Sequence, residues 1–369
     1  MSLLTVTTTC RGSFAATLAR GDVAAFQLDK LGNDRDTDIP RLRKGQVGAQ
    51  VLAAFLPTEI PHPATVTLEQ IDLIRRIEEI HAETFHPVRR AADIARARRL
   101  GKIGSIISVE GGVGLENSLA PLRAWHALGM RVMTLCHNGN LGWIDSATDK
   151  PAHNGLTEFG RSVIAELNRL GVLIDLSHAS LKAAHDVIDV STAPVALTHS
   201  NAFALCNHPR NAPDDLLARL PQNGGIVMAT FVPAFIRQKT RDALRKFQDE
   251  HGKAPVSIVS DDINAVKRAS LAEWENDGAA MLAEHVEYMT NIVGVDHIGI
   301  GSDFYGGPNP PGLEDASAFP HLFAELIERG WDETALAKLA GRNFVRVLKS
   351  VEKQATNSAS ARPRARRQA

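Results

Sequence analysis

Cysteine is scarce in this sequence, and its few occurrences form no pattern. Cys10, Cys136 and Cys206 are the 3 cysteines among 369 residues, and no two of them have the CxxC spacing of a zinc knuckle. A metal site built from cysteines alone is therefore excluded, and a disulfide framework is not expected. We expect free thiols, which are typical of a reducing compartment.

Long apolar segments are also missing. No run approaches the roughly 20 consecutive apolar residues that span a bilayer. Residues 1–10 lack the basic stretch followed by an apolar core that is typical of a secretory leader. We therefore expect no transmembrane segment and, for the chain as written, a cytoplasmic location. Export would be possible if an N-terminal segment is missing from this sequence.

Neither sign of charge is in excess. The chain has 41 Lys and Arg residues against 42 Asp and Glu residues, which gives a formal net charge of -1. Such a chain has no global field that attracts nucleic acid or an anionic membrane. We expect a small-molecule or peptide partner and no nucleic acid.

Hydrophobic residues make up 44% of the chain, enough for one large α/β domain. Apolar strand patterns alternate with amphipathic helix patterns, which predicts a TIM-type (β/α)8 barrel over residues 1–354. A disordered basic tail is expected over residues 355–369. The predicted strands are near 3–9, 47–56, 103–109, 132–135, 172–176, 194–198, 225–231 and 298–301.

Two of the predicted helices have start signals. Thr67 and Gln70 form a capping-box pattern, and Thr157 precedes a helix that Gly171 ends. We expect one helix to begin at residue 68 and another at residue 158.

Residues 236–278 break the alternation of strands and helices. They are charged and irregular, with isolated apolar residues, and predict a helical excursion over the barrel rim. A substrate-covering lid and an exposed insertion without catalytic role fit this pattern equally well.

Five predicted strands end on side chains that can perform chemistry. These residues are Glu110, His137, His178, His199 and Asp303. The carboxyl ends of parallel barrel strands meet at one rim, where barrel enzymes carry their active sites. Carboxylate oxygen and imidazole nitrogen are ligands that zinc accepts. We expect a three-ligand metal site made of Glu110, His178 and His199.

Several short segments, taken in order, resemble the membrane dipeptidase (renal dipeptidase) family. They are residues 39–48 (IPRLRKGQVG), 108–112 (SVEGG), 134–137 (TLCH), 170–178 (LGVLIDLSH), 198–202 (THSNA), 208–211 (HPRN) and 301–304 (GSDF). The resemblance runs from about residue 39 to residue 351. It implies a barrel of the metal-dependent hydrolase type that hydrolyses dipeptides with a zinc-bound hydroxide.

The resemblance also implies roles for individual residues. Glu110 matches the position that bridges two zinc ions, and His178 and His199 match ligands of the second ion. His137 and Arg210 match the substrate-contacting residues, and Asp303 matches the active-site aspartate.

These roles agree with the chemistry of the side chains. Arg210 can pair with the C-terminal carboxylate of a dipeptide, His137 can donate to the tetrahedral oxyanion, and Asp303 can accept a proton or hold the substrate ammonium. The other readings are a surface ion pair for Arg210 and a turn cap for Asp303.

The chain departs from the family at its front. Family members carry an Asp-Gly-His-x-Asp segment at the end of the first strand, whose His and Asp bind the other zinc. Residues 8–12 here read TTCRG, so Gly12 offers no ligand and Arg11 repels a cation, although Cys10 has a thiol. Two zinc ions are thus expected from the family, but one complete ligand set is visible.

Three explanations of this departure stay open. The start or reading frame is in error, the enzyme uses a single zinc ion, or the chain is a degenerate dipeptidase-like barrel that binds a small peptide or a partner without turnover. A homodimer is a possible assembly. Another amidohydrolase-type barrel would require a His-x-His pair on the first strand and a carboxylated lysine, and neither is visible.

Overall fold

Eight parallel strands form a ring in chain order. The computed structural model describes residues 3–7, 23, 26–33, 35–251, 271, 274–275, 277–305 and 309–360. The ring strands are β1 (Leu3–Thr7), β2 (Val47–Phe55), β4 (Ile103–Glu110), β5 (Met130–Thr134), β6 (Leu173–Asp175), β7 (Val195–Leu197), β8 (Ile226–Ala229) and β9 (Ile298–Ile300). The short β3 (Phe85–Pro87) pairs with β4 outside this order, and β9 returns to contact β1. The predicted TIM-type (β/α)8 barrel is confirmed.

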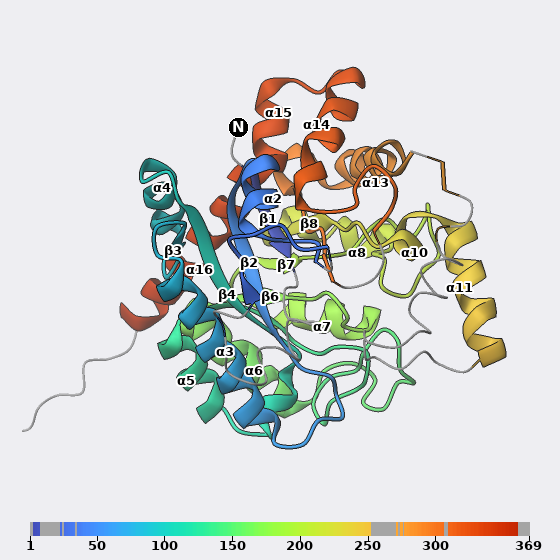
Figure 1. Cartoon of the computed structure of the whole chain (residues 1–369). Coiled ribbons are helices and arrows are strands. Elements are labelled where there is room, and N and C mark those ends of the chain that lie inside the picture. The colour runs from blue at the N-terminus through green and yellow to red at the C-terminus, as the bar shows by residue number, and fades with distance from the viewer. Residues whose placement is uncertain are drawn as a thin grey trace, which may run out of the picture.

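Helices surround the strands (Figure 1). They are α2 (Ile39–Lys44), α3 (Pro63–Ile80), α4 (Ala91–Arg99), α5 (Ala120–Leu128), α6 (Glu158–Leu170), α7 (Leu181–Val190), α8 (Asp214–Leu217), α9 (Leu220–Asn223), α10 (Pro233–Ile236), α11 (Gln238–His251), α13 (Gly278–Val293), α14 (Phe319–Glu328), α15 (Glu333–Ala337) and α16 (Asn343–Ser360). The α6 start confirms the predicted cap, because Thr157 Oγ1 accepts a hydrogen bond from Gly160 N. Gly171 ends α6 in the left-handed conformation, with φ of 73°.

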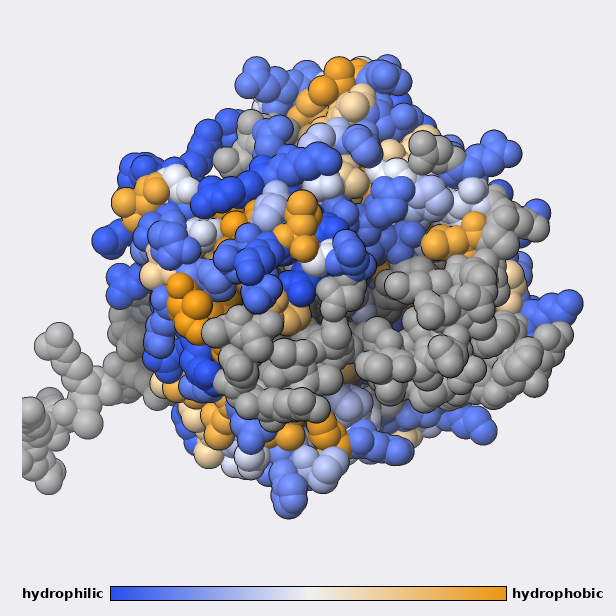
Figure 2. All heavy atoms as spheres, in the orientation of Figure 1, coloured by the Kyte–Doolittle hydropathy of each residue, from blue (hydrophilic) through white to orange (hydrophobic). Residues whose placement is uncertain are grey.

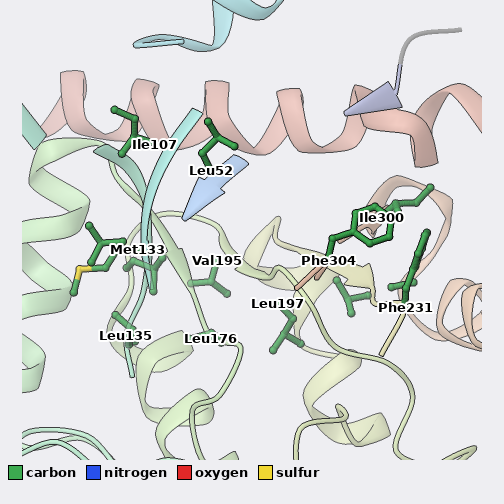
Figure 3. Packing of buried hydrophobic residues seen from close by; sticks show 14 of the residues in the cluster. Leu52, Ile107, Met133, Leu135, Leu176, Val195, Leu197, Phe231, Ile300 and Phe304 are labelled. Carbon is green, nitrogen blue, oxygen red and sulfur yellow. The ribbon is translucent and has the colours of Figure 1, made fainter. Parts of the chain in front are cut away.

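The strands are buried on both faces, so they read as apolar runs. All residues of β4 are buried. One hydrophobic cluster contains Leu52, Ile107 and Met133 on neighbouring strands (Figure 3). A second cluster joins the alternate residues of the strands, such as Val51 and Ile106, to the apolar side of α16. This packing on two sides holds the strand ends in place.

The predicted start of α3 is wrong. The helix begins at Pro63, and Thr67 lies inside it with its hydroxyl donating to Pro63 O at 2.7 Å. Proline suits the first helical turn because its φ is already helical and its missing N–H is not needed there. Thr67 therefore has no capping role.

Three predicted regions lie partly or wholly outside the described residues. The helical excursion begins as α10 and α11, and residues 252–270 lie outside. Helix α16 continues through Ser360, so a disordered tail stays a prediction only for residues 361–369, which also lie outside. Residues 8–12, with the departure from the family pattern, are likewise not described.

The coloured part of the face shown in Figure 2 is mainly hydrophilic. Figure 2 shows hydrophobic residues in small separate patches on the face in view. Exposed large hydrophobic side chains are scattered over the fold: Leu31, Leu68, Ile80, Leu100, Leu181, Leu205 and Ile327. Within the described residues, no helix has the length and apolar character needed to cross a bilayer.

Candidate metal centre

The predicted site residues gather at one end of the barrel. Glu110 is the last residue of β4, and the others follow the ends of the parallel strands β5, β6, β7 and β9: His137, His178, His199 and Asp303. Each of these five side chains is at least nine-tenths buried. Because strands and helices alternate along the chain, the strands are parallel and end at the same rim, which places these side chains together.

Glu110, His178 and His199 form a compact group of metal-binding atoms. His178 Nε2 lies 3.4 Å from Glu110 Oε1, and His199 Nε2 lies 3.8 Å from the same oxygen. One ligand atom from each residue falls within 4.8 Å of the other two. Two ligands of a tetrahedral zinc ion lie about 3.4 Å apart, since each is about 2.1 Å from the metal. The separations and the two-nitrogen, one-oxygen donor set therefore fit a metal ion of this kind.

The second ring nitrogen of each histidine has its own contact. His178 Nδ1 lies 3.1 Å from Asn138 Oδ1, an amide oxygen that can only accept a hydrogen bond. His199 Nδ1 lies 2.8 Å from the hydroxyl of Thr198. In a neutral His178 ring this contact places the hydrogen on Nδ1, and Nε2 then presents a lone pair on the side of Glu110. Such contacts orient metal-binding imidazoles.

Backbone strain contributes to this arrangement. His178 has φ of 74° and Asp303 has φ of 57°, both in the left-handed region. For residues with a side chain this conformation costs on the order of 1 to 3 kcal/mol, and it occurs often at functional sites. Gly111 has φ of 100°, and a Cβ there would lie 2.9 Å from Leu56 O. Only glycine fits next to Glu110 without displacing that carbonyl.

His137 lies beside the metal-binding group rather than within it. Its Nε2 is 3.9 Å from Glu110 Oε1, and its ring centroid is 4.2 Å from that of His178. The ring of Phe55 packs edge-on against it, with centroids 4.6 Å apart. Ser146 holds the backbone by donating to His137 O at 2.6 Å. His137 is thus fixed next to the group, in a position to face a bound molecule.

Arg210 is buried, with 5% of its surface exposed, so it is not a surface ion pair. Burial lowers the pKa of its guanidinium to about 10, against the opposing effect of the Asp303 carboxylate, and leaves it protonated at neutral pH. Nη2 donates to His199 O at 3.4 Å, while Nε has no hydrogen-bond partner among the described residues. The guanidinium also lies over the ring of Phe235, 5.4 Å from its centroid. A buried cation with spare donors favours an anionic ligand.

Three residues near the centre were not predicted from sequence. Asn138 and Thr198 contact the histidines directly, and Asp175 contacts Thr198. Asp175 carried a usable signal, because an acidic residue inside an apolar strand requires partners. Asn138 is an ordinary loop residue with no mark in its local sequence, and Thr198 lies in the segment 198–202 of the family resemblance, which gave it no role.

The described cysteines are free, buried thiols. Cys136 and Cys206 are both fully buried and unpaired with each other. Burial raises the pKa of Cys136 to about 12 and that of Cys206 to about 11, so both stay protonated at neutral pH. They act as small core residues, and Cys10 lies outside the described residues.

Comparison with known proteins identifies the family. Residues 5–362 match the sequence model described as "Membrane dipeptidase (Peptidase family M19)". The chain belongs to this family. It is a hydrolase of the M19 type, and the resemblance noted in its sequence is confirmed.

Two curated relatives are similar over most of the chain. The dipeptidase tcpJ of Claviceps purpurea (strain 20.1) is 37% identical over 327 residues, which cover 85% of this chain and 69% of that protein. The dipeptidase aclJ of Aspergillus oryzae is 36% identical over 338 residues, which cover 88% of this chain and 72% of that protein.

Solved structures share the fold. The probable dipeptidase PvdM from Pseudomonas aeruginosa superposes with a TM-score of 0.80 at 26% identity, covering 95% of this chain and 96% of that one. A metallo peptidase from Rhodobacter sphaeroides, bound to a phosphinate mimic of the dipeptide L-Ala-D-Ala, has a TM-score of 0.77 at 24% identity, covering 95% and 99% of the two chains. The latter likeness concerns the fold alone.

Proposed function

We propose that the protein hydrolyses dipeptides with zinc held by Glu110, His178 and His199. The observation that carries this proposal is the buried group of two imidazole nitrogens and one carboxylate oxygen, within 4.8 Å of one another, next to the buried cation Arg210. When bound, zinc would supply Lewis acidity toward the scissile carbonyl and make water more acidic. The described residues provide one complete ligand set, and a second ion would depend on residues outside them.

Arg210 would bind the C-terminal carboxylate of the substrate. Its guanidinium has donors to spare and lies in a buried position close to His199, which places a carboxylate near the metal-binding group. A planar guanidinium pairs with a carboxylate through two parallel hydrogen bonds. Because the carboxylate ends the substrate, such a pairing limits the number of residues between it and the scissile bond.

His137 and Asp303 would act on the reacting atoms. The His137 ring stands beside Glu110 and His178, so it can donate a hydrogen bond to the carbonyl oxygen as negative charge develops there. The Asp303 carboxylate lies close enough to Arg210 to raise the pKa of that guanidinium. In that place it can accept the proton of the attacking water or hold the substrate ammonium.

The degenerate-barrel reading remains the competing function, because residues 8–12 lack the family's first pair of ligands. The test measures bound zinc and dipeptide hydrolysis for the unmodified chain and for the double variant Cys10→His, Gly12→Asp. We expect zinc at the described site in both, and kcat/KM on the order of a thousandfold higher in the double variant, since it gains a metal that activates water.

Each outcome of this test separates the readings. Zinc and turnover in the unmodified chain support the proposed function, and equal kcat/KM in both chains shows that one zinc ion suffices. Turnover in the double variant alone favours an error at the front of the sequence. A chain that binds neither zinc nor dipeptide in either form contradicts the proposal, and a chain that binds a dipeptide without turnover in either form supports the degenerate barrel.

A further inference from the structure

Asp175 is a fully buried carboxylate with several hydrogen-bond donors around it. Its Oδ1 accepts from the backbone N–H groups of Ser177 at 3.0 Å and Thr198 at 2.9 Å. Its Oδ2 accepts from the hydroxyls of Thr134 and Thr198, each at 2.6 Å. All four contacts are donors to Asp175, which therefore accepts at both of its oxygens. A buried carboxylate is costly to retain unless such contacts compensate it.

The Thr198 hydroxyl connects this carboxylate to His199. A hydroxyl has one hydrogen, and Thr198 donates it to Asp175. The same oxygen lies 2.8 Å from His199 Nδ1, so it can only accept at that contact. His199 Nδ1 must then carry a hydrogen, and in the neutral ring Nε2 has a lone pair on the side of Glu110, 3.8 Å away.

We propose that Asp175 and Thr198 are positioning residues that select the metal-binding tautomer of His199. This inference rests on the proposed function, since it concerns how His199 is prepared to bind zinc. Asp175 orients the Thr198 hydroxyl, and the hydroxyl orients the imidazole ring. Asp175, Thr198 and His199, which this series of hydrogen bonds connects, are each 1% exposed or less. Solvent therefore does not replace a hydrogen-bonding group that a substitution removes.

The matched test compares two threonines that donate to the same oxygen of Asp175. Thr198→Val removes the hydroxyl that also contacts His199, while Thr134→Val removes a bond of the same length to Asp175 and leaves the His199 contact in place. Thr198→Ser keeps the hydroxyl. Zinc affinity is measured by competition with a chromophoric chelator, and thermal unfolding confirms that each variant is folded.

We expect a 10- to 100-fold loss of zinc affinity in Thr198→Val, a loss below about threefold in Thr134→Val, and near-complete recovery in Thr198→Ser. Equal losses in the two valine variants would overturn the proposal, because the network would then be purely structural. Unchanged affinity in Thr198→Val would overturn it as well.

A second measurement needs no metal. In the zinc-free protein with ¹⁵N-labelled histidine, NMR reports which ring nitrogen of His199 carries the hydrogen. We expect the Nδ1–H tautomer in the unmodified chain and a shift toward Nε2–H in Thr198→Val. An Nε2–H tautomer in the unmodified chain would overturn the inference even if zinc binds. Failure to bind zinc with the Nδ1–H tautomer present would instead contradict the proposed function alone.

Discussion

The two histidines of the metal-binding group are held in different ways. The Nδ1 partner of His199 is Thr198, which is 1% exposed and is itself held by Asp175 on the neighbouring strand. The Nδ1 partner of His178 is Asn138, an exposed residue in the segment between β5 and α6. One ligand is thus oriented by the barrel itself and the other by a loop. An acceptor held by rigid strands is placed more precisely than one held by a loop, so the loss of the two contacts is expected to have different effects.

The loop has its own internal support. The Asp145 carboxylate accepts hydrogen bonds from the backbone N–H groups of Ala152, His153 and Gly155, at 2.8 to 3.2 Å. Burial alone would raise the pKa of Asp145, but these backbone donors together lower it. Asp145 is thus one of several groups that hold this loop, and the Thr148 hydroxyl donates to Asn138 O at 2.8 Å.

The largest expected effect removes the negative charge from the carboxylate that both histidines face. Glu110→Gln replaces an anionic ligand by a neutral amide, and we expect zinc affinity and kcat/KM to fall on the order of a thousandfold or more. Metal analysis and dipeptide hydrolysis measure the two losses. Glu69→Gln, at an exposed position of α3, is the control and should behave as the unmodified chain. Retained zinc in Glu110→Gln would place the metal elsewhere.

The next effect concerns substrate rather than metal. Arg210→Ala should raise KM for dipeptides on the order of a hundredfold while kcat changes little, because the substrate carboxylate has the same charge in the ground and transition states. Steady-state kinetics of a free dipeptide measure the split, with zinc content as the control. If the unmodified protein cleaves a C-terminally amidated dipeptide as well as the free one, Arg210 has another role.

A smaller effect tests the difference between the two histidines directly. Asn138→Ala should weaken zinc binding only a few-fold, because water can replace the exposed amide oxygen as the acceptor for His178 Nδ1. Chelator competition gives the affinity, and the buried Thr198→Val change is the comparison. A loss in Asn138→Ala as large as that in Thr198→Val would show that exposure of the partner does not matter.

The strand ends that carry the site residues could be predicted from the sequence, but the hydrogen bonds that hold these residues from behind could not. Each apolar run followed by a histidine or carboxylate predicted a strand end, because that pattern is local. The contact of Thr134 with Asp175 depends on the register that sets these two residues opposite each other on β5 and β6. No local pattern encodes such a register. The start of α3 was misplaced because a proline start competes with a capping box, and sequence alone does not rank the two.

The smallest expected effect concerns the loop and pH. Since the folded-state pKa of Asp145 is lowered, its carboxylate adds stability above the pKa of the unfolded chain, about 3.9, and this contribution is lost as pH falls through the lower folded value. Asp145→Asn should therefore reduce the free energy of unfolding by about 1 kcal/mol at pH 7, with the difference shrinking below about pH 4. Urea unfolding at pH 7 and pH 3 measures it. A difference that grows toward low pH would contradict the assigned cause.

Zinc titration of the metal-free chain tests the central claim most directly. Zinc is added to the unmodified protein and to Glu110→Gln, and binding is measured from the heat released or by competition with a chelator. Dipeptide hydrolysis is recorded at each addition. The account predicts at least one tight site in the unmodified chain, hydrolysis that rises as that site fills, and neither in Glu110→Gln. Hydrolysis that is independent of zinc, or a tight site that survives Glu110→Gln unchanged, would contradict the account.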